Sequence, residues 1–308
     1  MMPLLIEDVR SAMTPSGAFR SWAHLPTGPV ADENAFATAL ILEQLHRLGI
    51  GPMLEDIRDR AITFLLTCER PRGSGRFGFY PAGTQPDWIR DPLPPDTDDT
   101  ALCSLALFQA GRWPRERLRR QVCEVLAPYR LSRRPAGANW LRPGIYPTWM
   151  DGRRLRNPID ICVNLNILTL TRAAGLDQAQ GTVMIDMIRA ALDWAGPSPE
   201  RARQVMPYYP HPAELVQALV RAVSHDVEGA RELLRIVRTK SWATYETEPD
   251  TPICGSLGGG LIWTCPLLQR LRRHDGSDGA GRWMGHGCRE SAWLSGPRAP
   301  ARKAHENL

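Results

Sequence analysis

Three carboxylates lie within four residues in the segment Pro95-Asp96-Thr97-Asp98-Asp99-Thr100, at the start of an apolar stretch. One acidic residue in such a place is ordinarily a helix N-cap, which accepts hydrogen bonds from free backbone N–H groups. Three exceed that need, and carboxylates that are crowded together cannot all ionise cheaply. If water is excluded, one of them keeps its proton at neutral pH and becomes a general acid. The segment therefore predicts either an acid for catalysis or, more simply, a helix cap with an acidic first turn.

The chain offers five apolar helices that could position these carboxylates. Each predicted helix begins near a polar capping residue or a proline and continues with apolar residues at helical spacing. Their middles carry few charges, so we expect them to be buried on most sides. The predicted apolar helices cover residues 32–48, 96–111, 157–175, 211–223 and 257–271.

Amphipathic helices rich in Arg and Glu alternate with the apolar ones. They are predicted for residues 4–13, 53–67, 115–127, 179–194 and 227–237. Because strand-like alternation is scarce, this order predicts an all-α fold, an α/α barrel or toroid with an inner ring of helices inside an outer ring. We expect one barrel domain over residues 1–271, followed by a linker-like, mobile C-terminal tail over residues 272–308.

Four long links lead into the N-terminal ends of the apolar helices. They are rich in Pro, Gly and aromatic residues, which is typical of structured loops that build binding sites. They comprise residues 71–95, 131–157, 196–210 and 240–255. We therefore expect the site at this mouth of the barrel, where helix dipoles also favour negative groups.

The segment Asp96-Thr97-Asp98-Asp99 resembles the D-x-D-D signature of the squalene–hopene cyclase and class II diterpene cyclase superfamily. The run Gly73-Ser74-Gly75-Arg76-Phe77-Gly78-Phe79-Tyr80 is similar to the Gly-aromatic loops of its repeats. The segments at residues 157–164 and 206–212 resemble parts of single-barrel bacterial relatives, and the resemblance spans roughly residues 30 to 271.

The resemblance implies a terpenoid cyclase-like α/α barrel that acts as a class II-type terpene cyclase. Such an enzyme protonates an isoprenoid double bond or epoxide, and the carbocation then cyclises. Asp98 would be the Brønsted acid, Asp99 would flank it, and Asp96 would hold its proton in the reactive orientation. The superfamily usually closes its cavity between two barrels, so this single-barrel chain would close its cavity with the long loops or a second copy, or leave it open.

Aromatic faces in the long links could stabilise a cation without attacking it, although loop aromatics ordinarily serve as packing anchors. Asp160 and Asn164 lie one turn apart on one predicted helix, so both could face the cavity. The expected substrate-binding residues are Phe77, Phe79, Tyr80, Trp88, Trp149, Asp160, Asn164, Tyr208, Tyr209 and Trp242, with Trp140, Tyr146 and Tyr245 as further aromatic candidates.

Other chemistries fit the sequence less well. The D-D-x-x-D pattern of magnesium-dependent terpene synthases lacks its third carboxylate, and the D-x-C zinc pattern of protein prenyltransferases is missing. No metal or cofactor is expected for protonation, and Mg²⁺ is expected only if the substrate bears a diphosphate, which Arg153, Arg154 and Arg156 could hold.

Two alternative functions stay open. One is a non-catalytic barrel that binds a lipid or a partner protein. The other is a carbohydrate-active enzyme that pairs Asp98 with Asp160 or Glu214.

Composition and charge limit the classes of binding partner that we expect. The formal net charge is +5, but the Arg residues are interspersed with acids and no basic stripe with aromatic platforms is present, so nucleic-acid binding is not expected. No stretch of about 18 apolar residues and no signal peptide is seen. The seven scattered cysteines are typical of reduced thiols, which favours a cytoplasmic location. Peripheral membrane contact and homo-oligomer formation stay open.

Overall fold

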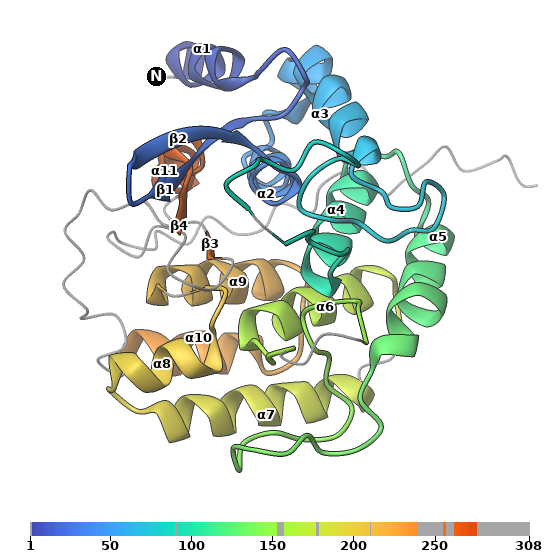
Figure 1. Ribbon diagram of the computed structural model, residues 1–308, viewed down its shortest axis with the longest axis vertical. Coiled ribbons are helices and arrows are strands. Elements are labelled where there is room, and N and C mark those ends of the chain that lie inside the picture. Colours follow the sequence, from blue (N-terminus) through green and yellow to red (C-terminus); the bar gives the residue numbers. More distant parts are fainter. Residues whose placement is uncertain are drawn as a thin grey trace, which may run out of the picture.

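A computed structural model describes residues 2–89, 91–152, 157–176, 179–209, 211–239, 255–256 and 262–275. The chain is mostly helical and carries one small antiparallel sheet near the N-terminal helix, as Figure 1 shows. The helical expectation is confirmed, and the expectation of an all-α chain is wrong because of the sheet.

Four of the five predicted apolar helices are confirmed, and each is buried along most of its length. Each begins at a capping side chain that accepts a backbone N–H, namely that of Asn34, Asp96, Asp160 or His211. Gly49 and Gly111, with φ of +69° and +72°, lie just beyond the first two of these helices, in the left-handed conformation that glycine adopts without strain. The helices are α2 (Ala35–Arg47), α4 (Thr97–Gln109), α6 (Ile161–Ala173) and α9 (Pro212–Ser224).

The amphipathic helices are confirmed as well, with small shifts in their bounds. One further helix, α8 (Pro199–Val205), lies in a segment that was expected to be a loop. Its signal is local, because Ser198 accepts from the N–H of Arg201 and Pro199 occupies the first turn. The amphipathic helices are α1 (Met2–Ala12), α3 (Glu55–Thr67), α5 (Arg115–Arg120), α7 (Ala179–Ala195) and α10 (Ala230–Thr239). Shorter turns η1 (Gly51–Leu54), η2 (Gln121–Leu126) and η3 (Ala127–Tyr129) precede α3 or extend α5.

The fifth apolar helix, predicted for residues 257–271, is wrong in its first half. The strand β4 (Ile262–Thr264) occupies that part, and α11 (Pro266–Asp275) begins only at Pro266. Proline favours the first turn of a helix and disrupts its interior, so it sets the start of α11. Residues 257–261 lie outside the described residues.

The sheet has the strand order β2-β1-β4-β3, and all of its pairs are antiparallel. It joins the two ends of the described chain, because Trp22 pairs with Thr264 and Ala23 with Trp263. The strands are short and half-exposed, so their alternation is weak in the sequence. The remaining strands are β1 (Arg20–Leu25), β2 (Gly28–Glu33) and β3 (Gly255–Ser256).

The buried helices lie side by side in chain order. α4 packs between α2 and α6, α6 packs on α9, and α11 packs on α2. A buried ion pair connects the last two of these buried helices: the two Nη atoms of Arg272 in α11 lie 2.9 and 3.1 Å from the two carboxylate oxygens of Glu214 in α9. The domain boundary expected after residue 271 therefore falls inside α11, and residues 276–308 lie outside the described residues.

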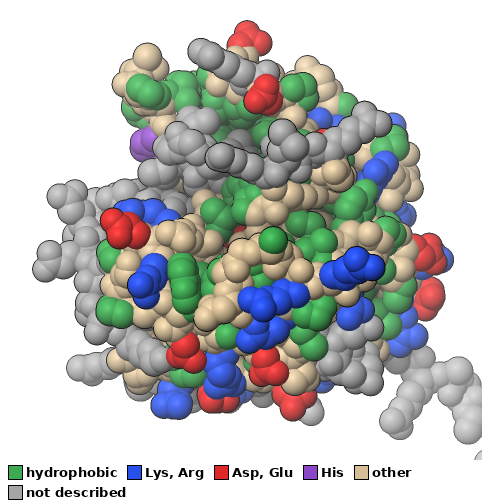
Figure 2. Space-filling view, turned by 60° about the horizontal axis from the view of Figure 1, so that its bottom comes forward, with side chains coloured by type: hydrophobic (Ala, Val, Ile, Leu, Met, Phe, Trp, Pro, Cys, Tyr) green, Lys and Arg blue, Asp and Glu red, His purple; other side chains and the backbone are tan. Residues whose placement is uncertain are grey.

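The surface carries charges of both signs. On the face in Figure 2, Lys and Arg side chains are interspersed with Asp and Glu and with hydrophobic side chains, and they form no continuous basic stripe there. Among the helices of the described residues, none combines the length and the apolar character that crossing a membrane requires.

Candidate functional site

A small cavity of about 40 Å³ lies at the N-terminal end of α4. The long links preceding α4, α6 and α9 all contribute to its wall, so the cavity lies where the sequence placed the candidate site, at the start of the buried helices. Its described lining holds three carboxyl groups and six aromatic side chains and has no Lys or Arg. The residues are Phe36, Phe79, Asp96, Asp98, Asp99, Thr148, Trp149, Tyr208, Tyr209 and Trp263.

Asp96 acts as the N-cap of α4 and also faces the cavity. Its Oδ1 accepts the backbone N–H of Asp99 at 2.7 Å, and its own N–H donates to the carbonyl oxygen of Phe77 at 3.0 Å. Burial raises the pKa of Asp96 to about 7, and the neighbouring Asp98 carboxylate adds to the rise. The simpler interpretation of the motif, a helix cap, is therefore correct for this one residue.

Asp98 has hydrogen-bond donors at both carboxyl oxygens. Asn166 Nδ2 donates to Oδ1 at 2.8 Å, and the Tyr209 hydroxyl bonds to Oδ2. Burial raises the pKa of Asp98, whereas these two bonds and the more distant Arg221 guanidinium act to lower it. The result is a carboxyl group that tends to hold its proton yet has partners ready for its ionised form.

Asp99 differs from both neighbours, because no N–H or hydroxyl group donates to either of its buried carboxyl oxygens and the side chain that it meets is the carboxyl group of Asp96. Burial raises the pKa of Asp99 well above its ordinary value, and the carboxyl groups of Asp96 and Asp98 raise it further. The guanidinium of Arg70 opposes this rise without forming an ion pair among the described contacts. A buried carboxyl group without partners is stable only when it carries a proton.

The aromatic wall is a set of rings in edge and stacked contact. Phe36 lies 5.6 Å from Tyr209, edge-on, and 6.3 Å from Phe79, stacked. Phe79 in turn contacts the edge of Trp263 at 5.2 Å. Phe79, Tyr208, Tyr209 and Trp149 were expected at the site, and the structure brings them together.

Phe36 and Trp263 also line the cavity, and neither was expected there. Phe36 was assigned to the buried part of a helix, and Trp263 lies on a strand where a helix was expected. Asp32 holds Trp263 in place by accepting its Nε1–H at 2.8 Å, and it also accepts the Tyr80 hydroxyl at 3.1 Å. Tyr80 therefore supports the wall from behind.

Several other expected residues hold the loops and do not line this cavity. Phe77 packs against Trp113 at 5.9 Å, and its N–H donates to the Thr100 hydroxyl. Trp88 packs on Trp263 at 5.9 Å. Trp242, Tyr245 and the basic residues 153, 154 and 156 lie outside the described residues.

Asp160 and Asn164 stabilise the loops that carry the aromatic wall. Asp160 accepts the N–H groups of Cys162 at 2.7 Å and of Tyr208 at 2.9 Å. Burial raises the pKa of Asp160 to about 7 against the effect of these bonds. Asn164 forms two hydrogen bonds of 2.9 Å with the backbone of Tyr146, one as acceptor and one as donor. Asp160 and Asn164 thus lie one turn apart on α6, as their spacing predicts, but the contacts that they make stabilise loops.

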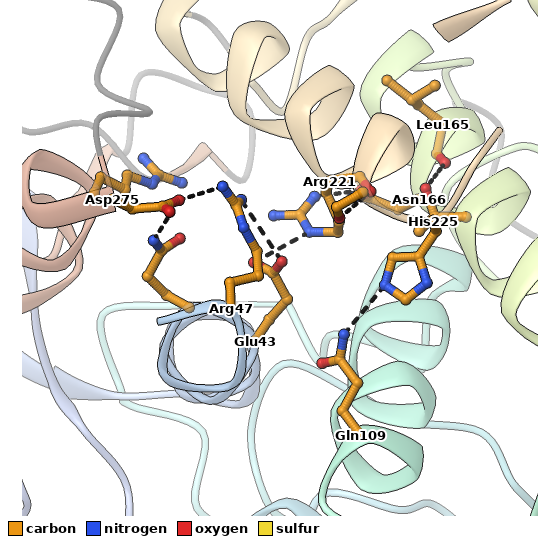
Figure 3. A network of polar contacts seen from close by, with 12 residues as sticks. Glu43, Arg47, Gln109, Leu165, Asn166, Arg221, His225 and Asp275 are labelled. Carbon is orange, nitrogen blue, oxygen red and sulfur yellow. Dashed lines mark hydrogen bonds and ion pairs between the residues drawn. The ribbon is translucent and has the colours of Figure 1, made fainter. Parts of the chain in front are cut away.

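A polar network behind Asp98 was not expected. Asn166 accepts from Arg221 Nη1 at 2.6 Å, and Arg221 pairs with Glu43 at 3.6 Å; Figure 3 shows that these residues come from three different helices. Glu43 also lies 3.7 Å from Arg47, which pairs with Asp275 at the end of α11. Mid-helix polar residues with distant partners leave no local pattern, so sequence spacing could not find them.

Among the described residues, no three His, Cys, Asp or Glu side chains are arranged to hold a metal ion. Comparisons with protein-family models, with curated proteins and with solved structures each find no match to this chain.

Proposed function

We propose that the chain is a single-barrel, class II-type terpene cyclase that starts cyclisation or isomerisation of an isoprenoid-like, apolar substrate by protonating it. One observation carries this proposal: three buried carboxyl groups share a cavity with six aromatic side chains, and the described lining contains no cation. An acid for an apolar substrate needs such a dry, cation-tolerant environment.

The architecture that we propose is an α/α barrel. In it, α2, α4, α6, α9 and α11 form the inner ring, and α1, α3, α5, α7 and α10 form the outer one. Support comes from the order of inner-helix contacts and from the Glu214–Arg272 ion pair between α9 and α11. Inner and outer helices also alternate strictly along the chain, apart from the short α8.

In the proposed first step, Asp98 gives its carboxyl proton to one carbon of a double bond. The π electron pair forms the new C–H bond, the other carbon becomes cationic, and Asp98 becomes a carboxylate. Burial keeps the proton on Asp98 before this step. Asn166 and Tyr209 stabilise the carboxylate afterwards, because both can donate to it. The step itself requires no metal, and Mg²⁺ has a role only if the substrate bears a diphosphate.

The two flanking carboxyl groups have different proposed roles. Asp96 fixes the start of α4 and therefore the direction in which Asp98 points. Asp99, whose pKa burial and the neighbouring carboxyl groups raise, favours its protonated form, in which it adds no negative charge that would hold the Asp98 proton back. The rings of Phe36, Phe79 and Trp263 then face the developing cation.

The small volume of the cavity supports a second candidate, a non-catalytic barrel that binds a lipid or a partner. A space of about 40 Å³ holds little more than one water molecule.

The carbohydrate-active alternative has less support. Glu214 has both oxygens bonded to Arg272, and Asp160 accepts backbone N–H groups. Neither carboxylate is available as the partner that hydrolysis with Asp98 would need.

The test is to incubate the full chain with uncharged polyprenes, polyprenyl alcohols and polyprenyl diphosphates, with and without a chelator, and to analyse products by mass spectrometry. Asp98→Asn should lower product formation by at least about 1000-fold while circular dichroism shows an unchanged fold. Asp87→Asn, an exposed carboxylate in the loop before α4, is the matched control and should retain full activity. Full activity in Asp98→Asn would refute the assignment, and absence of products from every substrate would favour the non-catalytic barrel.

A further inference from the structure

A second and larger cavity, of about 640 Å³, borders the acidic one. Trp149 lines both cavities, so this residue lies between them. The residues just before it divide between the two spaces: Pro147 lines the larger cavity and Thr148 the smaller. The two cavities are therefore neighbours across one short segment of chain.

The lining of the larger cavity is mixed, and its apolar part can accommodate a hydrocarbon. Its volume lies within the range of about 300–1,000 Å³ that is typical of small-molecule sites. Exposed residues, including Pro128 and Ala136, belong to the lining, so solvent can reach the space. Aromatic and aliphatic side chains supply one part of the wall, including those of Tyr129, Trp140, Leu141 and Ile159. The polar residues Asp151, Asn157 and Gln204 supply another.

Trp149 has a fixed backbone. Its N–H donates to Asn157 Oδ1 at 2.8 Å, its carbonyl oxygen accepts from Asn157 Nδ2 at 2.7 Å, and it forms a β-bridge with Asp96. The indole Nε1 donates to the Tyr208 hydroxyl at 2.6 Å, and the two rings meet edge to face. The backbone bonds of Trp149 do not involve its indole, whose hydrogen bond is the one to Tyr208.

We propose that the larger cavity binds the hydrocarbon chain of the substrate and that the Trp149 side chain turns aside to admit the reactive end to Asp98. The identity of the ligand rests on the proposed function. The acidic cavity is too small for an isoprenoid unit, so a substrate needs an adjoining apolar space, and the larger cavity adjoins it at Trp149.

Farnesol is a suitable probe, and its binding to the full chain can be measured by isothermal titration independently of any turnover. Ala136→Trp fills the larger cavity from its exposed rim and should weaken farnesol binding at least tenfold. Ala31→Trp makes the same change at an exposed position of β2 and should leave the Kd within twofold. No binding to the unmodified chain, or equal binding to the chain and to Ala136→Trp, would overturn the proposal.

The role of Trp149 is tested in the same assay. Trp149→Ala should tighten farnesol binding at least threefold, because no side chain then has to move before the ligand enters. Trp149→Phe, which preserves an aromatic wall, serves if the alanine variant does not fold, and it should tighten binding less. Weaker binding in both folded variants would show that Trp149 is an ordinary contact and would overturn its gating role.

The two proposals can fail separately. Farnesol binding that Ala136→Trp abolishes, without product from any isoprenoid, would refute catalysis and support the larger cavity as a binding site. Product formation that Ala136→Trp leaves unchanged would support catalysis and overturn the assignment of the larger cavity.

Discussion

Two groups of buried carboxyl groups in this protein differ in their partners: one group is paired with arginine side chains and the other is not. Glu214 and Glu43 have arginine partners: Arg272 binds both oxygens of Glu214, and Arg221 and Arg47 flank Glu43. The three carboxyl groups at the start of α4 have no such ion pair among the described contacts. Arginine is nevertheless close, because Asn166 stands between Arg221 and Asp98. The comparison suggests that pairing serves to cross-link helices, whereas the cavity is arranged to keep protons on its acids.

The largest expected effect lies in the paired group. Arg272→Met should lower the free energy of unfolding by about 3–5 kcal/mol, because it leaves Glu214 buried and uncompensated. The double variant Arg272→Met with Glu214→Leu should recover most of this loss in chemical denaturation. Arg270 lies on the same helix as Arg272 but forms an exposed ion pair, with Asp8 of α1. Arg270→Met should therefore lower the free energy of unfolding by less than about 1 kcal/mol. Equal losses from Arg270→Met and Arg272→Met would contradict the distinction between buried and exposed pairs.

Asp160 sharpens the comparison, since it is buried without a cation but bonds to backbone N–H groups. Asp160→Ala removes the cap of α6 and leaves the N–H of Tyr208 without its acceptor, so unfolding should become easier by about 2–3 kcal/mol. Asp160→Asn, which keeps an acceptor at the cap, should cost clearly less in the same thermal denaturation experiment. If both variants match the original chain, Asp160 does not hold the aromatic loop.

The unpaired group should make stability depend on pH. Burial raises the pKa of Asp96 from 3.8 to about 7, so the folded protein binds this proton more tightly than the unfolded chain. Its contribution to stability is complete below about pH 4 and is lost as the pH rises to about 7. Asp96→Asn preserves the helix cap and should reduce the slope in this window by about 1 kcal/mol per pH unit. Unfolding curves at several pH values measure it, with Asp87→Asn as control; an unchanged slope would show that Asp96 is ionised in the folded state.

The smallest effect is expected at Asp99 and has the opposite sign to that at Arg272. Because its pKa is raised well above the ordinary value, Asp99 holds its proton more tightly in the folded than in the unfolded chain, so its contribution to stability falls as the pH rises above the ordinary pKa, and at pH 8 it is a cost. Asp99→Asn removes this cost and should increase the free energy of unfolding by about 1 kcal/mol. Destabilisation at pH 8, measured with denaturant, would indicate that Asp99 has a favourable partner.

Most of the helices, and the end of the helices beside which the cavity lies, were predictable from local sequence signals. Asp96, Asp160 and His211 each mark the start of a helix, and the aromatic links lead to the helix N-termini beside which the cavity lies. What could not be predicted depends on contacts between residues far apart in the chain. Asn166 and Arg221 look like ordinary polar helix residues until packing places one beside Asp98 and the other behind it.

The sheet shows the same limitation. Residues 257–271 have apolar content that fits a helix or a strand, and the pairing of β4 with the distant β1 decides the matter. Trp263 becomes part of the cavity wall through that pairing and through Asp32, which lies in β2. Loop aromatics such as Phe77 and Trp88 were predicted as lining, but composition alone cannot distinguish a lining ring from one that packs behind it.

The pairing of β1 with β4 also has a consequence for how the protein matures on the ribosome. Strand β1 emerges early, but its partner at Ile262–Thr264 is synthesised some 240 residues later. Until then one edge of the β1–β2 hairpin has no neighbour and can pair with a foreign strand, a common route to aggregation. Since Trp263 arrives with β4, a nascent or truncated chain can form α4 and its carboxyl groups without a closed aromatic wall. The wall of the acidic cavity is thus completed last, once the two ends of the fold have met.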